Sequence, residues 1–395
     1  MLRLAVLVVG ALLVLATFRG VIVTLVVPRR ARRKRRITSS LLASALWRLV
    51  RGTFEIIARA ARLVRRGRTP EDQYRAEDQL LGRLGPISLL TLLGTWLALV
   101  FLGFAMMMWG VSHTSVGGAL NLAGSSVLTL GLKQPAGGAQ TVLSYLAAAC
   151  GLIVLAIEIG YLPTIYGHFN RREAQMRILE SRAGRPAWGA EILARQQQVG
   201  ALDTMADFYA SWEAWSADLM ESHLTFPWLM LFRSSDPLES WITSLLAVLD
   251  SAALYLALCP TTAPNSRARQ CLRMGFTTLR RLADMLGIDY VEDPLPSDPI
   301  ELSRDEFEIA VSYLKDSDFP LERTACAAWP DFHGWRVNYE PIVYELVKLL
   351  HAPPALWSGA KNPIHPLTVL DRSRDDPEGA KHPRLRKPST DQDRP

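Results

Sequence analysis

The sequence lacks the short motifs by which many enzymes are identified. It contains no GxSxG, no HExxH, no GxxxxGK followed by Ser or Thr, and no dinucleotide-binding fingerprint. Its four cysteines have no CxxC spacing, which argues against a zinc site and a disulfide framework: Cys150, Cys259, Cys271 and Cys326. We therefore expect no catalytic residue, no metal site and no cofactor, and an enzyme is the least favoured class of function.

Charged residues are nearly absent from three long apolar stretches, residues 4–27, 87–111 and 142–165. The chain as a whole has 395 residues, of which 49% are hydrophobic, which is too apolar for an ordinary soluble enzyme. Each stretch can cross about 30 Å of hydrocarbon, because a helix needs roughly 20 residues for that distance. The sequence thus predicts three membrane-spanning helices, the first within residues 1–28.

Positive charge is concentrated directly after the first apolar stretch. The segment "PRRARRKRR" places seven cations within residues 29–36 of a chain whose net charge is +6. Basic residues mark the cytoplasmic side of a membrane helix, so we expect the N-terminus to lie outside. A cleaved signal peptide and a nucleic-acid patch are the alternatives, and contact with lipid headgroups is favoured over nucleic-acid binding.

The next segment combines an amphipathic pattern with a polar linker. Apolar residues and arginines occupy different faces at helical spacing over residues 41–64. This helix is expected either on the inner membrane surface or packed on a cytoplasmic domain. The linker "GRTPEDQYRAEDQ" then leads to the second span, which opens at Gly85 and Pro86. Residues 29–84 are therefore expected to form a basic, helical segment that is cytoplasmic or interfacial.

The charges flanking the second and third spans constrain the connection between them. Arg83 precedes the second span, whereas Arg171 and Arg172 follow the third, and residues 113–140 contain one lysine. The residues before the second span and those after the third should then be cytoplasmic, and the connection between the two spans should be external. Residues 115–132 are apolar enough to enter a membrane, so the connection either re-enters it or forms an outer loop.

The remainder of the chain has the pattern of a soluble helical domain. We expect this cytoplasmic domain over residues 171–352, with helices at five places: 202–221, 238–257, 266–286, 304–316 and 339–350. Residues 353–395 are rich in proline and mixed charge and are predicted to form a disordered tail.

Several motifs resemble bacterial potassium channels of the pore-loop superfamily, which have a two-helix core. The pore region of that family commonly reads "SGVTFFTLGYGD", and this chain has "GSSVLTLGLKQP". The inner helix and its exit, "IGYLPTIYGHFNRREAQMRILESRAG", are also similar, as are three cytoplasmic stretches: "WEAWSADLMESHLTFPWLMLFRSSDPLESW", "RDEFEIAVSYL" and "YEPIVYEL" with "APPALW". The resemblance covers roughly residues 85–357.

The resemblance implies an all-α membrane protein of the pore-loop channel fold. Its pore domain, residues 85–170, would contain an outer helix (87–111), a re-entrant pore helix and filter (115–134) and an inner helix (141–168). It further implies a homotetramer in the bacterial inner membrane, surrounded by lipid, with a cytoplasmic C-terminal domain whose partner is unknown. The permeant ion would be a monovalent cation such as K⁺, and the filter would consist of Thr129, Leu130, Gly131, Leu132 and Lys133.

The filter departs from the family pattern after its first glycine. Leu132, Lys133 and Gln134 stand where the family has Tyr, Gly and Asp. A potassium filter needs rings of backbone carbonyls, and lysine adopts the glycine conformation poorly. Four ammonium groups about 10 Å apart would also repel one another by roughly 0.4 kcal/mol per pair in bulk water. A non-conducting scaffold or sensor with the channel fold is therefore the alternative function.

Two charges and two glycines within the apolar stretches are further candidates. Arg19 and Glu158 are at similar predicted depths, so Glu158 is expected to face either Arg19 or a water-filled inner cavity, where four carboxylates would favour cations. Both side chains could instead extend to the interface. Gly151 and Gly160 are candidate hinges of the inner helix, or close-packing sites between helices.

Overall fold

The structure, a computed structural model, describes three stretches of the chain: residues 1–23, 69–112 and 114–366. Three predicted segments lie outside them: the basic segment 29–36, the amphipathic helix 41–64 and residues 367–395 of the tail. Within the described stretches the named elements are all helices, and strand-like pairing is limited to one isolated bridge, Ala355 with Ile364. The predicted all-α class is therefore confirmed.

The chain divides into two compact units. Unit 1 comprises Met1–Val64, Gln79–Asn170 and His223–Phe232. Unit 2 comprises Arg65–Asp78, Arg171–Ser222 and Arg233–Pro395. Unit 1 thus takes in residues 223–232, which lie far from its other parts in the sequence, and this inclusion was not predicted.

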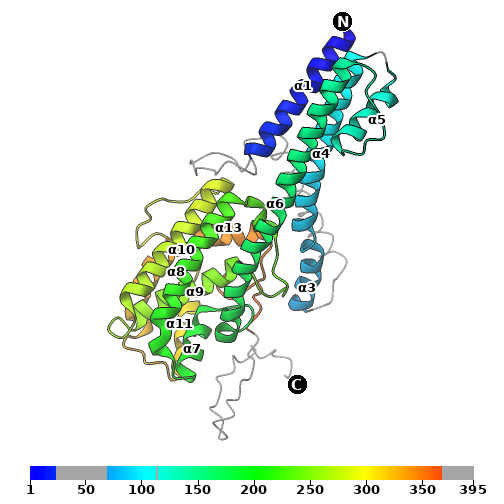
Figure 1. Ribbon diagram of the computed structural model, residues 1–395. Coiled ribbons are helices and arrows are strands. Elements are labelled where there is room, and N and C mark those ends of the chain that lie inside the picture. Colours follow the sequence, from blue (N-terminus) through cyan, green and yellow to red (C-terminus); the bar gives the residue numbers. More distant parts are fainter. Residues whose placement is uncertain (24–68, 113, 367–395) are drawn as a thin grey trace, which may run out of the picture. The chain divides into compact units, whose positions relative to one another are not determined.

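Unit 1 is built from long apolar helices (Figure 1). Its elements are α1 (Leu2–Val21), α4 (Leu84–Val111), α5 (Val116–Val127), α6 (Gly138–Ala183) as far as residue 170, and the short 3₁₀ helix η3 (Pro227–Leu231). The outer and inner helices predicted at 87–111 and 141–168 are thus present as α4 and α6. Helix α6 runs without interruption past the end of unit 1, although it contains Pro163.

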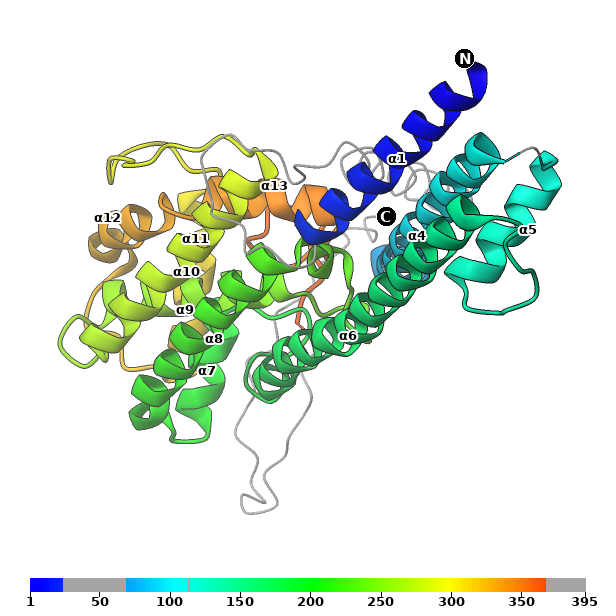
Figure 2. The same ribbon diagram turned by 45° about the horizontal axis from the view of Figure 1, so that its top comes forward.

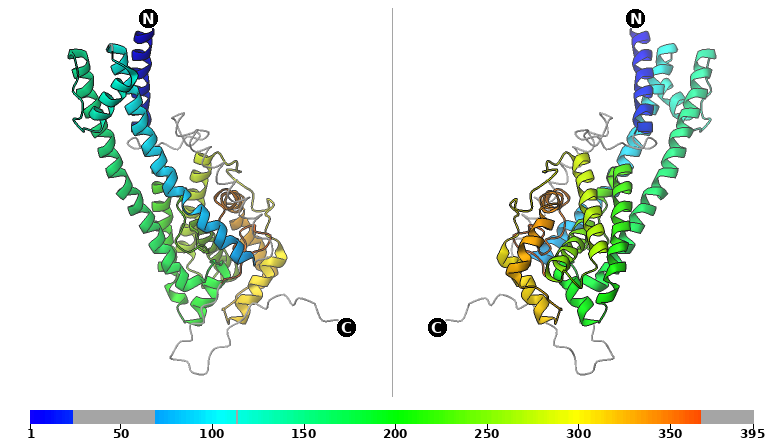
Figure 3. Two further views of the ribbon diagram at one scale, coloured as in Figure 1. Left: turned by 90° about the vertical axis from the view of Figure 1, so that its right-hand side faces the viewer. Right: turned by 90° about the vertical axis from the view of Figure 1, so that its left-hand side faces the viewer.

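Helices α1 and α4 run antiparallel and in close contact, side by side in both views of Figure 3. The Arg3 guanidinium at the start of α1 donates to the Ser112 carbonyl just after α4, at 2.6 Å. A Cβ added at Gly10 would lie 2.6 Å from the Gly103 carbonyl oxygen. Small residues at these positions let the two backbones approach, as is common between helices in membranes.

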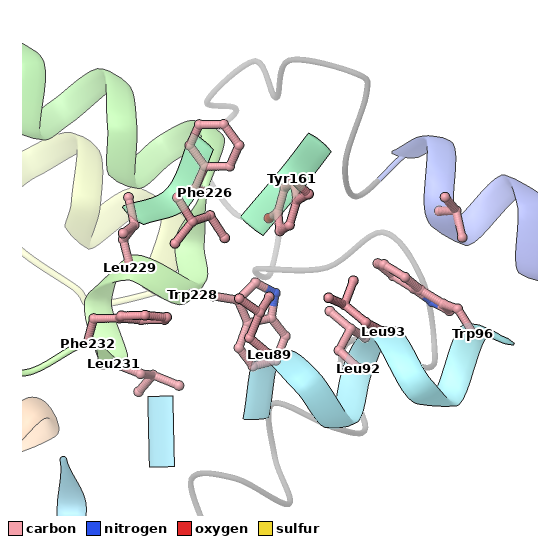
Figure 4. Close-up of a cluster of buried hydrophobic side chains, with 12 residues drawn as sticks. Leu89, Leu92, Leu93, Trp96, Tyr161, Phe226, Trp228, Leu229, Leu231 and Phe232 are labelled. Atoms are coloured by element: carbon pink, nitrogen blue, oxygen red, sulfur yellow. The ribbon is translucent and has the colours of Figure 1, made fainter. Parts of the chain in front are cut away.

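An aromatic cluster explains why residues 223–232 belong to unit 1. Figure 4 shows side chains from α4, α6 and the η3 segment directed toward one another. The rings of Tyr161 and Phe226 lie 5.5 Å apart edge to face, and a Cβ at Gly85 would approach the Leu231 carbonyl to 2.7 Å. The labelled members are Leu89, Leu92, Leu93, Trp96, Tyr161, Phe226, Trp228, Leu229, Leu231 and Phe232.

Unit 2 is a bundle of shorter helices arranged around α9 (Trp241–Leu258) (Figure 2). Every residue of α9 is buried. The surrounding helices are α7 (Gly189–Gln198), α8 (Met205–Thr225), α10 (Asn265–Leu286), α11 (Arg304–Asp316), α12 (Ala325–Arg336) and α13 (Glu340–Leu350). Five of the predicted helices are therefore confirmed as α8, α9, α10, α11 and α13. Helices α7 and α12 were not predicted, whereas α3 (Pro70–Leu81) lies within the helical segment predicted at 29–84, in the part expected to be a polar linker.

Four described helices are long and apolar enough to cross a membrane: α1, α4 with the turn before it, α6 and α9. Helix α9 differs from the other three, because the protein itself buries all of its side chains. Large apolar side chains on the others are exposed, including Leu12, Leu102 and Leu152. Exposed apolar surface on α1, α4 and α6 is compatible with a membrane protein.

A buried ionic cluster forms the polar centre of unit 2. The fully buried guanidinium of Arg336 contacts the carboxylates of Asp250 and Glu340, each at 2.5 Å. It also donates to the Trp357 carbonyl at 2.6 Å. Trp357 and Ile364 are buried in turn, so the packed chain extends beyond the tail boundary predicted after residue 352. The reason is that residues of this segment contact the rest of unit 2: the Trp357 carbonyl accepts from Arg336, and Ile364 packs against Tyr74 and Leu238.

Candidate pore segment

Helix α5 packs against the other helices of unit 1 along one face. One face of α5 packs in a cluster with α1, α4 and α6. A Cβ at Gly151 of α6 would lie only 2.1 Å from the Val127 carbonyl oxygen at the end of α5. The buried members are Val14, Val100, Phe104, Ala105, Met108, Ala119, Leu122, Ala123, Val127, Leu143, Ala147 and Val154. The protein therefore buries one face of α5 and leaves the rest of the helix and the following loop exposed.

The loop after α5 is tied to that helix at two places, Ser125 near its end and Gly118 near its start. Ser115 caps the N-terminus of α5 by accepting from the Gly118 amide at 3.1 Å, and the Lys133 ammonium reaches the Gly118 carbonyl at 3.3 Å. The Lys133 amide lies 3.0 Å from the Ser125 hydroxyl, so the backbone of residues 128–133 stays beside the last turns of α5 and the Lys133 side chain covers the distance to Gly118. The loop is thus folded against the C-terminal end of α5.

The loop has an unusual backbone at the predicted filter. Thr129 has φ of 54° and Gly131 has φ of 68°, whereas Leu130 between them does not have a positive φ. The left-handed region is accessible to glycine but is strained for a β-branched residue, at a cost on the order of 1–3 kcal/mol. Such strain persists only where neighbouring contacts impose it.

Ser125 supplies those contacts. Its carbonyl accepts from the amides of Leu130 at 2.8 Å and Gly131 at 3.4 Å, and its hydroxyl accepts from the amide of Lys133 at 3.0 Å. Ser125 itself is buried. One residue near the end of α5 therefore holds three backbone amides of the loop. The sequence analysis missed this role, because a serine in "AGSSV" carries no signal that separates it from an ordinary helical serine.

The predicted filter residues are exposed in the single chain. Leu130 is 55% exposed and Leu132 is 82% exposed, and Thr129, Gly131 and Lys133 are exposed as well. Exposed large apolar residues on a loop held in one conformation are characteristic of an interaction surface. The Lys133 side chain differs from its neighbours because it bends back onto the backbone of α5 at Gly118. Gly118 leaves room for it, since a Cβ there would lie 3.3 Å from the ammonium.

The structure does not bring the two intramembrane charges together. Arg19 is exposed and Glu158 is partly buried, and the two form no ion pair in the described part of the chain. One oxygen of Glu158, Oε1, is buried without a hydrogen-bond partner. A lone buried carboxyl oxygen in an apolar helix is costly, and since Glu158 does not pair with Arg19, the predicted alternative of a polar inner cavity is favoured over that pair.

The two candidate hinge glycines lie in different surroundings. Gly151 is in tight contact with Val127, as a close-packing site requires. Gly160 faces open space, and Pro163 follows it three residues later. A proline inside a helix removes one backbone hydrogen bond, so the weak point of α6 is at residues 159–163. The sequence analysis did not name Pro163, although proline within an apolar run is a usable signal.

The end of α6 that belongs to unit 2 is held by ion pairs. Arg177 contacts Glu239 at 3.2 Å and Ser235 at 2.8 Å, and Arg185 pairs with Asp236. Burial raises the pKa of the Glu239 carboxyl to about 7, against the opposing effect of Arg177. These contacts fix the continuation of α6 to the segment between α8 and α9.

Comparisons of the chain with protein-family models, with curated proteins and with solved structures give no significant match. The resemblance to pore-loop channels therefore rests on the motifs quoted above, and the function has to be argued from the geometry of the pore segment.

Proposed function

We propose that this protein is a membrane ion channel of the pore-loop class, in which four copies of the chain surround a pore lined by residues 129–133. The observation that carries the proposal is the exposed loop of residues 129–133, which is bonded to Ser125 and has left-handed backbone at Thr129 and Gly131. Thr129 ends α5 as a helix cap, because the amides of Thr129 and Leu130 bond the carbonyls of Ser126 and Ser125. Gly131 adds a second left-handed position two residues later, and a filter uses such positions so that successive carbonyls can point to the same side.

Two features support a membrane location for unit 1, the length and apolarity of its helices and the exposure of their apolar side chains. Helices α1, α4 and α6 are long and apolar and expose large apolar side chains. Helix α9 is not counted among the spans, because it is fully buried in unit 2. With the basic segment 29–36 on the cytoplasmic side, the N-terminus and α5 lie outside, and unit 2 lies in the cytoplasm of a bacterial cell.

A tetramer is proposed because one chain leaves the pore segment uncovered. Non-helical backbone at membrane depth is tolerated only where protein buries it or water lines it. The exposed Leu130 and Leu132 would be covered by neighbouring copies, and the carbonyls of the loop would face a common axis. The permeant ion is proposed to be a monovalent cation.

Lys133 is compatible with cation passage in the conformation that the chain adopts. Its ammonium is bonded to the Gly118 carbonyl of the same chain, which draws it away from a free position at the end of the loop. Glu158 adds negative charge on the helix that would line the inner cavity, where a ring of carboxylates attracts cations. Weakly selective cation conduction is the behaviour that these two residues favour.

The alternative is a scaffold or sensor that keeps the channel fold without conducting. The specific observation in its favour is that Lys133 stands where the family has the second filter glycine and does not have a positive φ. The second left-handed position of an intact filter is therefore absent, and with it one ring of inward-facing carbonyls.

Ion flux into liposomes that contain the purified protein tests the proposal, with K⁺, Na⁺ and Cl⁻ compared. We expect cation flux from the parent chain and a strong decrease in Gly131→Ala, because a left-handed conformation costs an alanine about 1–2 kcal/mol. Gly137→Ala is the matched control, since Gly137 lies in open space without a positive φ.

A second variant separates the two candidate functions. Lys133→Gly combined with Gln134→Asp restores the family pattern. If only the restored protein conducts, the parent is a non-conducting relative of channels. If the parent and the restored protein are both silent although each forms tetramers, the channel proposal is refuted.

A further inference from the structure

Lys133 is the one charged residue of a long apolar part of the sequence. Between Arg83 and Glu158 the chain contains no other Lys, Arg, Asp or Glu residue. The ammonium group of Lys133 therefore has no carboxylate of the pore segment to pair with, and it donates instead to a backbone carbonyl, that of Gly118, at 3.3 Å. The position of this single ammonium group thus decides where the pore segment carries positive charge.

Gly118 makes this docked position of the ammonium group possible. A Cβ at residue 118 would lie 3.3 Å from the Lys133 Nζ atom, which is closer than an ordinary contact between two non-bonded atoms. The neighbouring Gly117 has open space around it, with nothing within 4 Å of an added Cβ. Neither glycine has a positive φ, so the backbone would accept another residue at either position. What Gly118 contributes is the absence of a side chain.

The docked position is only weakly favoured. Its hydrogen bond of 3.3 Å is longer than the usual N–H···O distance of about 2.7–3.2 Å. Gly118 lies in the first turn of α5, where the helix dipole presents partial positive charge that opposes a cation. The exposed Lys133 side chain also loses rotamer freedom when it is held in one place. The ammonium group therefore exchanges between a docked and a released position.

Release of the ammonium group leaves the backbone of the loop in place. The Lys133 amide donates to the Ser125 hydroxyl at 3.0 Å, and the amides of Leu130 and Gly131 donate to the Ser125 carbonyl. None of these bonds involves the Lys133 side chain. Exchange between the two positions therefore moves a positive charge from the first turn of α5 to the exposed end of the loop, while residues 129–133 keep their backbone conformation.

We infer that Gly118 is a positioning residue for cation entry: it holds the Lys133 ammonium group on α5, and a released ammonium group places positive charge at the mouth of the pore. The inference rests on the proposed function, in which residues 129–133 of four copies surround the pore. Four released ammonium groups oppose the entry of cations and attract anions, and this effect grows as the dielectric constant of the pore falls. The docked position thus favours cations.

Ion flux into liposomes that contain Gly118→Val tests this role, with K⁺ and Cl⁻ compared. The valine side chain occupies space that the docked ammonium group needs. We expect the ratio of K⁺ flux to Cl⁻ flux to decrease about fivefold. Gly117→Val is the matched control, because it makes the same change in helix propensity in open surroundings, and it should leave the ratio unchanged. Equal ratios in the two variants would overturn the inference.

A double substitution separates the placing of the charge from an effect on the packing of α5. Such an effect has to be tested because a Cβ at Gly118 would also lie 3.3 Å from the Ser115 Oγ atom. Lys133→Met removes the charge and should raise the ratio of K⁺ flux to Cl⁻ flux. Adding Gly118→Val to Lys133→Met should then change nothing further, since no ammonium group is left to displace. If Gly118→Val lowers the ratio equally with and without Lys133, the inference is wrong.

Labelling with an amine-reactive reagent tests the docked position independently of ion flux. For the full-length protein in detergent, mass spectrometry gives the labelling rate of Lys133 relative to that of the exposed Lys315 in unit 2. We expect faster labelling of Lys133 in Gly118→Val than in the parent and in Gly117→Val, because a released amine is more accessible. Equal rates in the three proteins would overturn the inference even if all of them conduct. If the rates differ but neither the parent nor Lys133→Met conducts any ion, the proposed function is refuted, and the role of Gly118 in cation entry with it.

Discussion

Replacing Arg336 by methionine should destabilise unit 2 more than any exposed charge removal. Arg336 is fully buried between Asp250 and Glu340, whose side chains are each 1% exposed. In Arg336→Met both carboxyl groups lose their counter-charge, and the Trp357 carbonyl loses a donor. Removing one partner of a buried ion pair costs about 3–5 kcal/mol, which for a unit of this size lowers the midpoint of thermal unfolding by about 6–20 °C.

The loss should also depend on pH in a predictable direction. Burial raises the pKa of Asp250 to about 6, even though Arg336 acts to lower it. Without Arg336 the charged form of Asp250 is still less favourable, so the folded variant gains stability when this carboxyl is protonated. The difference between the parent and Arg336→Met should therefore be largest above pH 6 and decrease at lower pH.

Thermal unfolding followed by tryptophan fluorescence measures both effects. Trp335 precedes Arg336 in the chain, and Arg336 donates a hydrogen bond to the Trp357 carbonyl, so both indoles report on this site. Arg304→Met is the control, since its pair with Glu308 is about half exposed and is worth less than about 1 kcal/mol. Equal unfolding midpoints for the two variants would refute the assignment of Arg336 as the polar centre of unit 2.

Three further predictions concern the pore segment and α6. Gly151→Ala should disrupt the packing of α5 and reduce tetramer yield and ion flux, because its Cβ would lie 2.1 Å from the Val127 carbonyl oxygen. Gly160→Ala should be tolerated, since Gly160 faces open space. Equal tetramer yield and flux for the two variants would contradict this prediction. Glu158→Gln should reduce cation flux measured in liposomes, and unchanged flux and assembly would exclude a role in the cavity. Glu239→Gln should flatten the pH dependence of unfolding of unit 2 between pH 4.5 and 7: the folded-state pKa is raised from 4.5 to about 7, so the parent loses stability as pH rises through this range. A parent protein whose unfolding midpoint is constant over that range would count against the last prediction.

The helical framework could be predicted because its causes are local. The apolar stretches at 87–111 and 142–165 are long enough that only a spanning or fully buried helix can satisfy them, and α4 and α6 are found there. Helices α7 and α12 escaped prediction for a local reason as well. The stretch that becomes α12 contains Pro330 and Gly334, which normally indicate a break.

Contacts between distant residues could not be predicted from the same patterns. Asp250 and Arg336 are separated by 86 positions, and nothing in either neighbourhood indicates the other. Helix α9 is apolar enough to be a membrane span, and only the helices packed around it show that its side chains are buried by protein. The same limit applies to residues 223–232, which join unit 1 through the aromatic cluster.

The sequence by itself determined the all-α class and the positions of the long apolar helices, because length, apolarity and charge are properties of neighbouring residues. Only the structure decided the conformation of residues 128–133. The left-handed backbone at Thr129 is imposed by Ser125, and the direction of the Lys133 side chain is set by Gly118, fifteen positions earlier. Hydrogen bonds that fold a loop back onto a helix depend on geometry that no local pattern encodes.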